Sequence, residues 1–531
     1  MADLFDAIIG AVGLASAPRA VGPGPCRVGA PASTVKRRAL SNIVGQVAVS
    51  AIQVLVIPKY VGLVGIEAYG LFGVYLSLQA FAQLLDFGMS PAVSREMSRA
   101  VARPSEAASI AGFLRTSELL YLGIGLALGM TLFAAAPFAA HNWIRPSALT
   151  HTDVTTAVRL IAVLTVAQWP LTFYHGALLG LGRAGTMNAI RVAGACVSAG
   201  GALALLTWVA PTIAVLFSWQ IVVGILQVAL LATQVRRALP RTATAGRFDL
   251  AALGASWRFG AGMTAVTITA TILTQMDKVV LTRALPLATF GYYALATVIS
   301  SGLGTLVASV FATTFPSFSV LVARGDNEAL RREYRRMWSV MGALVLPLGS
   351  VIVAFSSSVL LFWTGNATTA AMAAPLVSLL TVGSVLNGLM AVPYALQLAH
   401  GRTGLALRLN VALCLVGVPL LLVLTSRIGA IGAAAVWPTI SALYLVLGIP
   451  ATARAFPDVA TSPWLVRATV VPAIACVCVV TLLRALLPHS DTRAVILAYL
   501  GVAWLAAAGS FTLASHDFRD ILLTSMRGRR A

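Results

Sequence analysis

The sequence predicts an all-α, polytopic membrane protein with about 14 transmembrane helices: two six-helix bundles related by a pseudo-two-fold axis along the membrane normal, plus two additional C-terminal helices. Three observations lead to this fold class: the composition, the spacing of the apolar runs and an internal repeat. The 531 residues are 59% hydrophobic and only 10% charged, and the mean hydropathy is +0.89. So much apolar surface requires lipid as its solvent, where a helix satisfies its own backbone hydrogen bonds.

Apolar runs long enough to cross a bilayer follow one another along almost the whole chain. A span needs about 20 apolar residues, and on that basis we expect about 14 spans. They are 39–57, 69–90, 114–138, 157–180, 187–209, 213–235, 259–282, 290–320, 338–362, 374–398, 405–425, 431–450, 465–487 and 494–514. Pro170 and Pro393 lie inside the fourth and tenth spans, and we expect each to bend its helix.

The basic residues indicate how the spans are oriented. The net charge is +20, which in so apolar a chain indicates loops and anionic lipid headgroups rather than nucleic acid. Most basic residues lie in the even-numbered connections between spans, in the tails or at the adjoining helix ends. The exceptions are Lys59, Arg145, Arg283, Arg427 and Arg493 in odd-numbered connections, and Arg159, Lys278 and Arg484 inside spans. The positive-inside rule therefore predicts an even number of spans with both termini cytoplasmic.

An internal repeat relates the two halves of the chain. Five features recur in order after 218 to 221 positions: Tyr69–Gly70 and Phe290–Gly291, Val101–Arg103 and Val322–Arg324, Trp143 and Trp363, Gly182 and Gly401, and Trp219 and Trp437. Because six spans separate the copies, both enter the membrane in the same orientation. Transporters with such parallel repeats bind substrate between the two bundles and rock them alternately.

The repeat divides the chain into six segments. We expect a flexible cytoplasmic tail (1–37), an N-terminal bundle (38–237), a cytoplasmic linker (238–257), a C-terminal bundle (258–455), two added helices (456–515) and a basic cytoplasmic tail (516–531).

Sequence motifs of enzymes are missing. The chain has no H-E-x-x-H, G-x-S-x-G or G-K-[ST] sequence, and its five cysteines have no metal-ligand spacing. We therefore expect no catalytic residue, no cofactor and no metal site.

Asp277 and Lys278 are the most unusual residues of the apolar runs. They lie about 8 Å below the predicted outer end of the seventh span, at 1.5 Å per helical residue. Neighbours on a helix point about 100° apart, so we expect no well-aligned pair between them. Two interpretations remain open: both residues line a wet central cavity, or Lys278 reaches the headgroups while Asp277 pairs with a neighbouring helix.

Other polar residues lie within spans or at their ends. The further candidates for the cavity are Arg115, Arg159, Arg191, Arg258, Gln53 and Gln275. Arginines that face the cavity would make it positive and suited to phosphate, which a guanidinium binds through two parallel hydrogen bonds. Each arginine taken alone is more often an anchor at the membrane surface. For Asp86, at the cytoplasmic end of the second span, we expect a nearby arginine such as Arg95 as partner.

Several segments together resemble polysaccharide flippases of the Wzx type. The resemblance rests on "GIEAYGLFGVYLSLQAFAQLLDFGM" (65–89), "SREMSRA" (94–100), "QMDKVVLTRALPLATFGYYALA" (275–296), "FPSFSVLVARGD" (315–326), "LPLG" (346–349), "FWTGN" (362–366) and "PYALQLAHGRTG" (393–404). It covers about residues 38 to 450 in order. This family is part of the multidrug/oligosaccharidyl-lipid/polysaccharide exporter superfamily, whose members share two six-helix bundles.

The resemblance implies a function. It implies a flippase that moves undecaprenyl-diphosphate-linked oligosaccharide from the cytoplasmic to the outer leaflet of the bacterial inner membrane, for export of a surface polysaccharide. The partners implied are this glycan, membrane lipids, a coupling cation (H⁺ or Na⁺) acting through Asp277, and polysaccharide polymerase machinery. The acid and base of the "QMDK" motif correspond to charges that matter in the family, whereas Arg159 and Arg191 rest on physical grounds alone.

Two alternatives stay open. A multidrug or cation antiporter of the same superfamily would need an acidic cavity, but acids within the spans are few. A membrane glycosyltransferase or polymerase would need carboxylates on large outer loops, but the predicted outer loops are short and hold few acids, notably Asp153 and Asp491.

Overall fold

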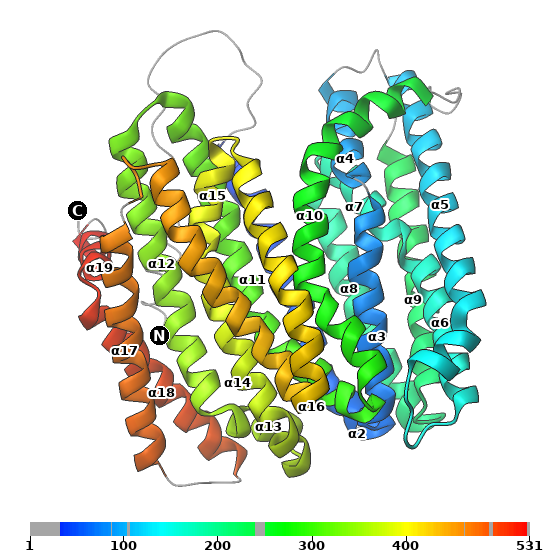
Figure 1. Cartoon of the computed structure of the whole chain (residues 1–531). Helices are drawn as coiled ribbons and strands as arrows, with labels where there is room; N and C mark the ends of the chain where they lie inside the picture. The colour runs from blue at the N-terminus through cyan, green and yellow to red at the C-terminus, as the bar shows by residue number, and fades with distance from the viewer. Residues whose placement is uncertain are drawn as a thin grey trace. The chain divides into compact units, whose positions relative to one another are not determined.

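The computed structural model describes residues 32–86, 88–102, 107–238, 250–460, 462–487 and 492–527. Within these ranges the chain is helical and has no β-strand (Figure 1). The prediction of an all-α, polytopic fold is therefore confirmed.

The contacts divide the chain into two compact units, and Arg37–Ala294 forms the first. Its helices are α2 (Ala32–Val64), α3 (Ile66–Ala82), η1 (Gln83–Asp86), α4 (Met89–Ala102), α5 (Ala107–Phe138), η3 (Ala139–Trp143), α6 (His151–Gln168), α7 (Pro170–Gly180), α8 (Ala184–Trp208), α9 (Ile213–Ala238) and α10 (Leu250–Ala284). Helix α10 packs on α3, α4 and α5, so the seventh predicted span groups with the helices that precede it.

The chain from Leu295 onward lies in the second unit. It holds most of α11 (Leu287–Arg324), then α12 (Asn327–Ala354), α13 (Ser356–Thr364), α14 (Ala367–Leu389), α15 (Ala391–Ala399), α16 (Thr403–Ala455), α17 (Ser462–Leu486), α18 (Arg493–Ala514) and α19 (His516–Arg527). The predicted boundary between the bundles, 238–257, differs from the break at Leu295, and residues 239–249 of it lie outside the described ranges.

Twelve helical stretches of the described residues are long and apolar enough to cross a membrane. The 53-residue α16 is one of these stretches but covers two predicted spans. The backbone is not helical at Ile428 and Gly429, which lie between those two spans. Helix α10, which contains Asp277 and Lys278, coincides with the remaining predicted span. The count is thus consistent with the predicted fourteen.

Both prolines for which a bend was predicted lie just after a break between two helices. Helix α6 ends at Gln168 and α7 begins at Pro170, which stands in its first turn, where a missing N–H costs nothing. Helix α14 ends at Leu389, and Pro393 lies in the first turn of α15.

The helix boundaries repeat along the chain. Helix α3 begins at Ile66 and α11 begins at Leu287, 221 positions later. The break between α6 and α7 recurs between α14 and α15 after the same interval. Helix α8 begins at Ala184 and α16 begins at Thr403, 219 positions later. The intervals found in the sequence therefore relate real structural elements.

The repeated glycines Gly182 and Gly401 end equivalent helices in the same way. Their φ angles are 72° and 70°, a left-handed conformation that disfavours other residues. In the first copy, the N–H groups of Gly182 and Arg183 donate to the carbonyls of Leu179 and Leu178. Gly401 and Arg402 donate likewise to Leu398 and Gln397. Both ends are Schellman motifs, which satisfy the last helical carbonyls.

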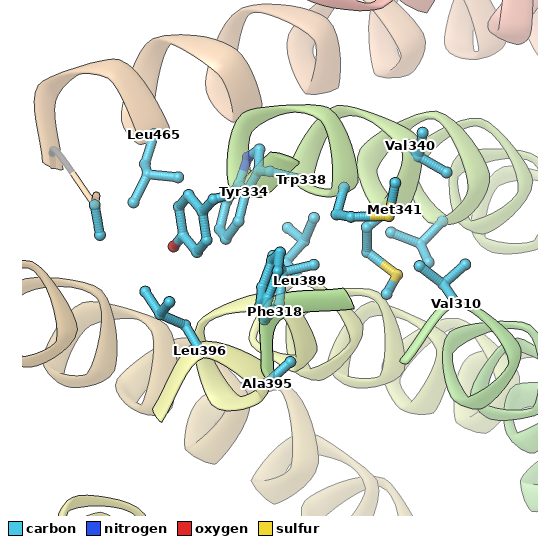
Figure 2. Packing of buried hydrophobic residues seen from close by; sticks show 14 of the residues in the cluster. Val310, Phe318, Tyr334, Trp338, Val340, Met341, Leu389, Ala395, Leu396 and Leu465 are labelled. Atoms are coloured by element: carbon cyan, nitrogen blue, oxygen red, sulfur yellow. The ribbon is translucent and has the colours of Figure 1, made fainter. Parts of the chain in front are cut away.

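Each unit has its own apolar core. In the first unit, buried residues of α4, α5, α7 and α9 pack together, among them Met97, Phe113, Phe173 and Leu231. In the second unit, Phe318, Tyr334 and Trp338 lie at the centre of a cluster that joins α11, α12 and α15 (Figure 2).

The additional C-terminal helices belong to the second unit and pack against α12. Trp338 of α12 donates to the hydroxyl of Thr469 on α17 at 3.1 Å. Arg335 lies over the ring of Trp464, 4.9 Å from its centroid, and Trp464 donates to Asp517 of α19 at 2.9 Å. These helices thus cover one face of α12.

Candidate functional site

The charged pair of α10 lies in a mostly buried position. The side chains of Lys278 and Asp277 retain 14% and 20% of their full exposure. Lys278 Nζ lies 3.1 Å from Oδ1 and 3.3 Å from Oδ2 of Asp277. The two residues therefore form an ion pair, and the prediction that they would not was wrong.

Their pairing has a simple geometric cause. The four-carbon lysine side chain folds back along α10, and its Nζ donates to the carbonyl oxygen of Thr274 at 2.7 Å. From there the ammonium also reaches the neighbouring carboxylate. The angle of about 100° between adjacent side chains keeps short side chains apart, whereas the long, flexible stem of lysine can bend back to its neighbour.

A tyrosine completes this group. Tyr293, in the second turn of α11, is fully buried, and its hydroxyl donates to Asp277 Oδ2 at 2.6 Å. Asp277 thus accepts hydrogen bonds from an ammonium and from a phenol. We name Thr274, Asp277, Lys278 and Tyr293 the charge cluster. Its charges balance, so an incoming anion can compete with Asp277 for Lys278.

Of the other predicted cavity residues, Gln275 lies between Thr274 and Asp277 in the chain, and the rest lie elsewhere in the sequence. Arg159 is exposed on α6, with its guanidinium 5.3 Å from the centroid of Phe133. Arg191 on α8 is half-buried. Arg115 and Gln53 are exposed on α5 and α2, Gln275 is half-buried on α10, and the side chain of Arg258 lies outside the described residues. Whether these six residues line a cavity stays a prediction.

A second polar group joins α3 to α6 inside the first unit. The Tyr75 hydroxyl donates to Gln168 Oε1 at 2.7 Å. Gln79 Nε2 lies 2.5 Å from that hydroxyl and 3.0 Å from the same Oε1. These uncharged groups satisfy one another, as polar side chains in apolar surroundings must.

Asp86 has different partners from those expected. Its Oδ1 accepts from the Tyr121 hydroxyl at 2.9 Å, and its Oδ2 accepts from the backbone N–H of Ser90 at 3.3 Å. The expected partner, Arg95, pairs instead with Glu96 beside it in α4. The pairing with Arg95 was therefore wrong, because a tyrosine from α5 already occupies the carboxylate.

Two further carboxylates were missed in the sequence. Glu118 accepts from the Tyr174 hydroxyl and pairs with Arg236 at 3.3 Å, which links α5, α7 and α9. Glu67, near the start of α3, is buried and accepts from the backbone N–H groups of Ser147 at 2.5 Å and Ala148 at 2.8 Å. Both carboxylates hold helices or loops together.

Each missed residue lies at a recognisable place in the sequence, but the sequence does not indicate which side chain or backbone group it contacts. Tyr293 stands within "FGYYALA", and Glu67 and Glu118 are isolated acids at the ends of apolar runs. An isolated acid at a membrane span needs a donor. Which donor it finds depends on how helices distant in sequence pack.

Among the described residues, no group of three or more His, Cys, Asp or Glu side chains could hold a metal ion. The charge cluster contains one carboxylate and one ammonium. Its chemistry suits the binding of ions.

Comparison with known proteins identifies related sequences. Residues 35–322 match the model of a family described as "Polysaccharide biosynthesis protein". A protein of Shigella flexneri whose name describes an O-antigen transporter is 19% identical over 374 residues, which cover 70% of this chain and 87% of the relative.

Solved structures show the same fold. The lipid II flippase MurJ, in an inward closed conformation, gives a TM-score of 0.65 at 12% identity, covering 90% of this chain and 98% of the other. An inward-facing multidrug resistance MATE family transporter of the MOP superfamily gives a TM-score of 0.64 at 14% identity, covering 86% and 99%. At such identity, the likeness is one of fold.

Proposed function

The chain belongs to the polysaccharide biosynthesis protein family, and from that premise we propose that it flips a polyprenyl-diphosphate-linked oligosaccharide. The lipid-linked glycan would pass from the cytoplasmic to the outer leaflet of the bacterial inner membrane, for export of a surface polysaccharide. The proposal is supported by the matched family, by the fold shared with MOP-superfamily transporters and, above all, by the ion pair of Asp277 and Lys278 on α10.

Lys278 would bind the anionic head of this substrate. In the structure, its ammonium is neutralised by Asp277 and donates a hydrogen bond to the carbonyl oxygen of Thr274. A diphosphate carries more negative charge than one carboxylate and offers more acceptor oxygens, so it would displace Asp277 from Lys278. Tyr293 would keep the released carboxylate hydrogen-bonded. The sugars would occupy a polar path while the prenyl chain stays in lipid.

Asp277 would also couple transport to a cation. A carboxylate that loses its ammonium partner in low dielectric binds a proton or Na⁺ more readily. Substrate binding to Lys278 and cation binding to Asp277 would then favour each other. Flipping forms no covalent bond, so the proposal requires no catalytic residue. The flipped glycan would pass to polymerase machinery, and both termini would lie in the cytoplasm.

The partners of the carboxylates favour the flippase over a multidrug or cation antiporter. A cationic drug needs an acid that is not already neutralised. Asp277 pairs with Lys278, and Glu118 pairs with Arg236. Asp86 and Glu67 accept from hydroxyl or backbone donors.

A strain that lacks the gene provides the test. We expect it to lose surface polysaccharide and to accumulate undecaprenyl-diphosphate-linked sugar on the cytoplasmic face. The wild-type gene should reverse both effects. A deletion strain with normal surface polysaccharide and no accumulated intermediate would refute the proposed function.

Variants of the pair test the site itself. We expect Asp277→Asn and Lys278→Ala each to reduce export strongly at unchanged protein level in the membrane. Asp153→Asn is the control, because that exposed carboxylate only caps α6. Full export by both α10 variants would exclude the pair from the transport path.

A further inference from the structure

The first turns of α12 contain four arginines, which differ in their partners. Arg332 and Arg336 each pair with a glutamate of the same helix, at 2.5 Å and 3.7 Å. Arg331 is exposed and Arg335 is half-buried, and neither forms an ion pair with any described residue. Because these two lie four residues apart, they share one face of α12. That face therefore has two positive charges without a counter-charge from the described chain.

Arg335 lies where α12 meets α17 and α19, which pack against it side by side (Figure 1). Its guanidinium lies over the ring of Trp464 on α17, 4.9 Å from the centroid. The indole N–H of Trp464 donates to Asp517 of α19 at 2.9 Å. A guanidinium that stacks on a ring keeps its N–H donors, which lie in its own plane, available for an anion.

A third arginine follows one turn after Trp464. Arg467 is exposed on α17, and within the described ranges it also forms no ion pair. Residues three apart on a helix are neighbours on its surface, so Arg467 lies beside the tryptophan that Arg335 covers. The region keeps a net positive charge, since Asp517 is the acid that contacts Trp464. We name Arg331, Arg335, Trp464 and Arg467 the arginine site.

An exposed apolar face of α17 begins next to the arginine site. Its residues are Val470, Val471, Ile474 and Val477, each about half exposed. They follow Arg467 by three, four, seven and ten positions, so they lie on the same side of the helix. In a membrane, acyl chains cover such a face. A ligand that joins a phosphate to an acyl chain therefore matches both parts of this surface.

We propose that an anionic phospholipid binds at the arginine site, with its phosphate held by Arg331, Arg335 and Arg467 and an acyl chain along the exposed face of α17. Guanidinium groups bind phosphate oxygens through paired hydrogen bonds. Trp464 is suited to the boundary between headgroups and chains, because its ring is apolar and its N–H is polar. A zwitterionic lipid carries its own cation, so the uncompensated arginines select an anionic one.

The bound lipid stabilises the attachment of the added C-terminal helices. Its phosphate joins Arg335 of α12 to Arg467 of α17, and the hydrogen bond from Trp464 to Asp517 extends this link to α19. All of these residues belong to the second unit. The inference does not depend on the proposed function, because it concerns the stability of the protein and not its substrate.

Thermal unfolding of the purified full chain tests the site. The protein, stripped of lipid in detergent, is titrated with phosphatidylglycerol or with phosphatidylcholine. We expect phosphatidylglycerol to raise the unfolding midpoint at mole fractions at which phosphatidylcholine does not. In Arg335→Gln/Arg467→Gln, the mole fraction that gives half of this shift should rise about fivefold for each arginine removed. Equal effects of the two lipids on the natural chain, or an unchanged titration of the variant, would overturn the proposal.

Two further variants separate the site from general charge attraction and from misfolding. Arg408→Gln/Arg427→Gln is the matched control, since it removes two exposed arginines of α16 in the same unit. It should titrate as the natural chain does, and a loss equal to that of Arg335→Gln/Arg467→Gln would refute a specific site. Arg335→Lys/Arg467→Lys keeps both charges and should keep most of the shift. A loss as large as that of the glutamine variant would contradict a role for charge.

A water-soluble headgroup distinguishes a lipid from a free phosphate. Glycerol 3-phosphate has the phosphate of phosphatidylglycerol but no acyl chain, so we expect it to leave the unfolding midpoint unchanged. Native mass spectrometry should show phosphatidylglycerol retained on the natural chain and largely lost from Arg335→Gln/Arg467→Gln. Stabilisation by glycerol 3-phosphate as strong as that by the lipid would assign the site to soluble phosphates and overturn the proposal.

Discussion

At the scale of residues, carboxylates in the apolar surroundings of the first unit accept hydrogen bonds from tyrosine hydroxyls and amide N–H groups. Asp277, Asp86 and Glu118 each accept from a tyrosine hydroxyl of another helix. A phenol reaches far and stays neutral, so it satisfies a carboxylate without adding a second buried charge. Among these three acids, only Asp277 and Glu118 also form an ion pair.

Glu67 shows what a buried carboxylate contributes when it binds only backbone. Glu67→Ala leaves the N–H groups of Ser147 and Ala148 without their acceptors. We expect a loss of about 1.5–3 kcal/mol in the free energy of unfolding, because hydrogen bonds to charged groups are worth that much. The measurement is the thermal unfolding midpoint of the purified protein, which should fall. Glu328→Ala is the control, since its exposed pair with Arg332 contributes little. Equal midpoints for both variants would contradict the role of Glu67.

At the scale of elements, the two copies of the repeat use the same breaks but differ in how they continue. Residues 66–102 of the first copy are divided into α3, η1 and α4, whereas the equivalent stretch of the second copy is the single helix α11. The charge cluster belongs to the second copy alone, since Asp277 and Lys278 of α10 have no charged counterparts in α2. A specialised role in substrate binding fits this asymmetry.

The paired Schellman motifs allow a prediction with an internal control. Gly182→Ala and Gly401→Ala place a side chain at φ angles of 72° and 70°. We expect each to cost about 1–2 kcal/mol, because a left-handed conformation is strained for an L-residue with a Cβ. Gly185→Ala and Gly404→Ala lie three residues later inside helices, with nothing within 4 Å of the added methyl group. They should be neutral or stabilising in the same thermal unfolding assay, and a reversed order would refute the assignment.

At the scale of the whole molecule, each unit has a separate apolar core, and the second core includes the added C-terminal helices. Phe511 of α18 and Phe518 of α19 pack in the cluster that contains Trp338. Gly342 of α12 leaves room for the ring of Phe511. The added helices therefore stabilise the second unit.

Truncation tests this contribution. A chain that ends at Ala455 loses α17, α18 and α19 and exposes the apolar face of α12. We expect a much lower yield of monodisperse protein in detergent, measured by fluorescence-detected size exclusion. A chain that ends at Arg527 keeps all three helices and should behave as the full chain does. Equal yields from the two truncations would show that the added helices do not stabilise the unit.

Much of the fold could be predicted from local sequence. The spans, the helix breaks near Pro170 and Pro393, and the repeat interval follow from hydropathy, proline chemistry and spacing. The candidate site was only partly predictable. Asp277 and Lys278 stood out as charges in an apolar helix, but neither their mutual pairing nor the hydrogen bond from Tyr293 to Asp277 could be predicted. For Asp86, charge alone predicted an arginine partner, but its carboxylate accepts a hydrogen bond from Tyr121 of α5 instead.

The sequence by itself determined the membrane class, the order of the helices and the positions where two copies correspond, because each of these depends on neighbouring residues along one chain. Only the tertiary structure decided which side chains meet. It brought Tyr293 to Asp277, and it set Gly73 against Ala294, 221 positions away. Such contacts depend on how helices pack, and packing is decided by the shapes of surfaces from distant parts of the chain.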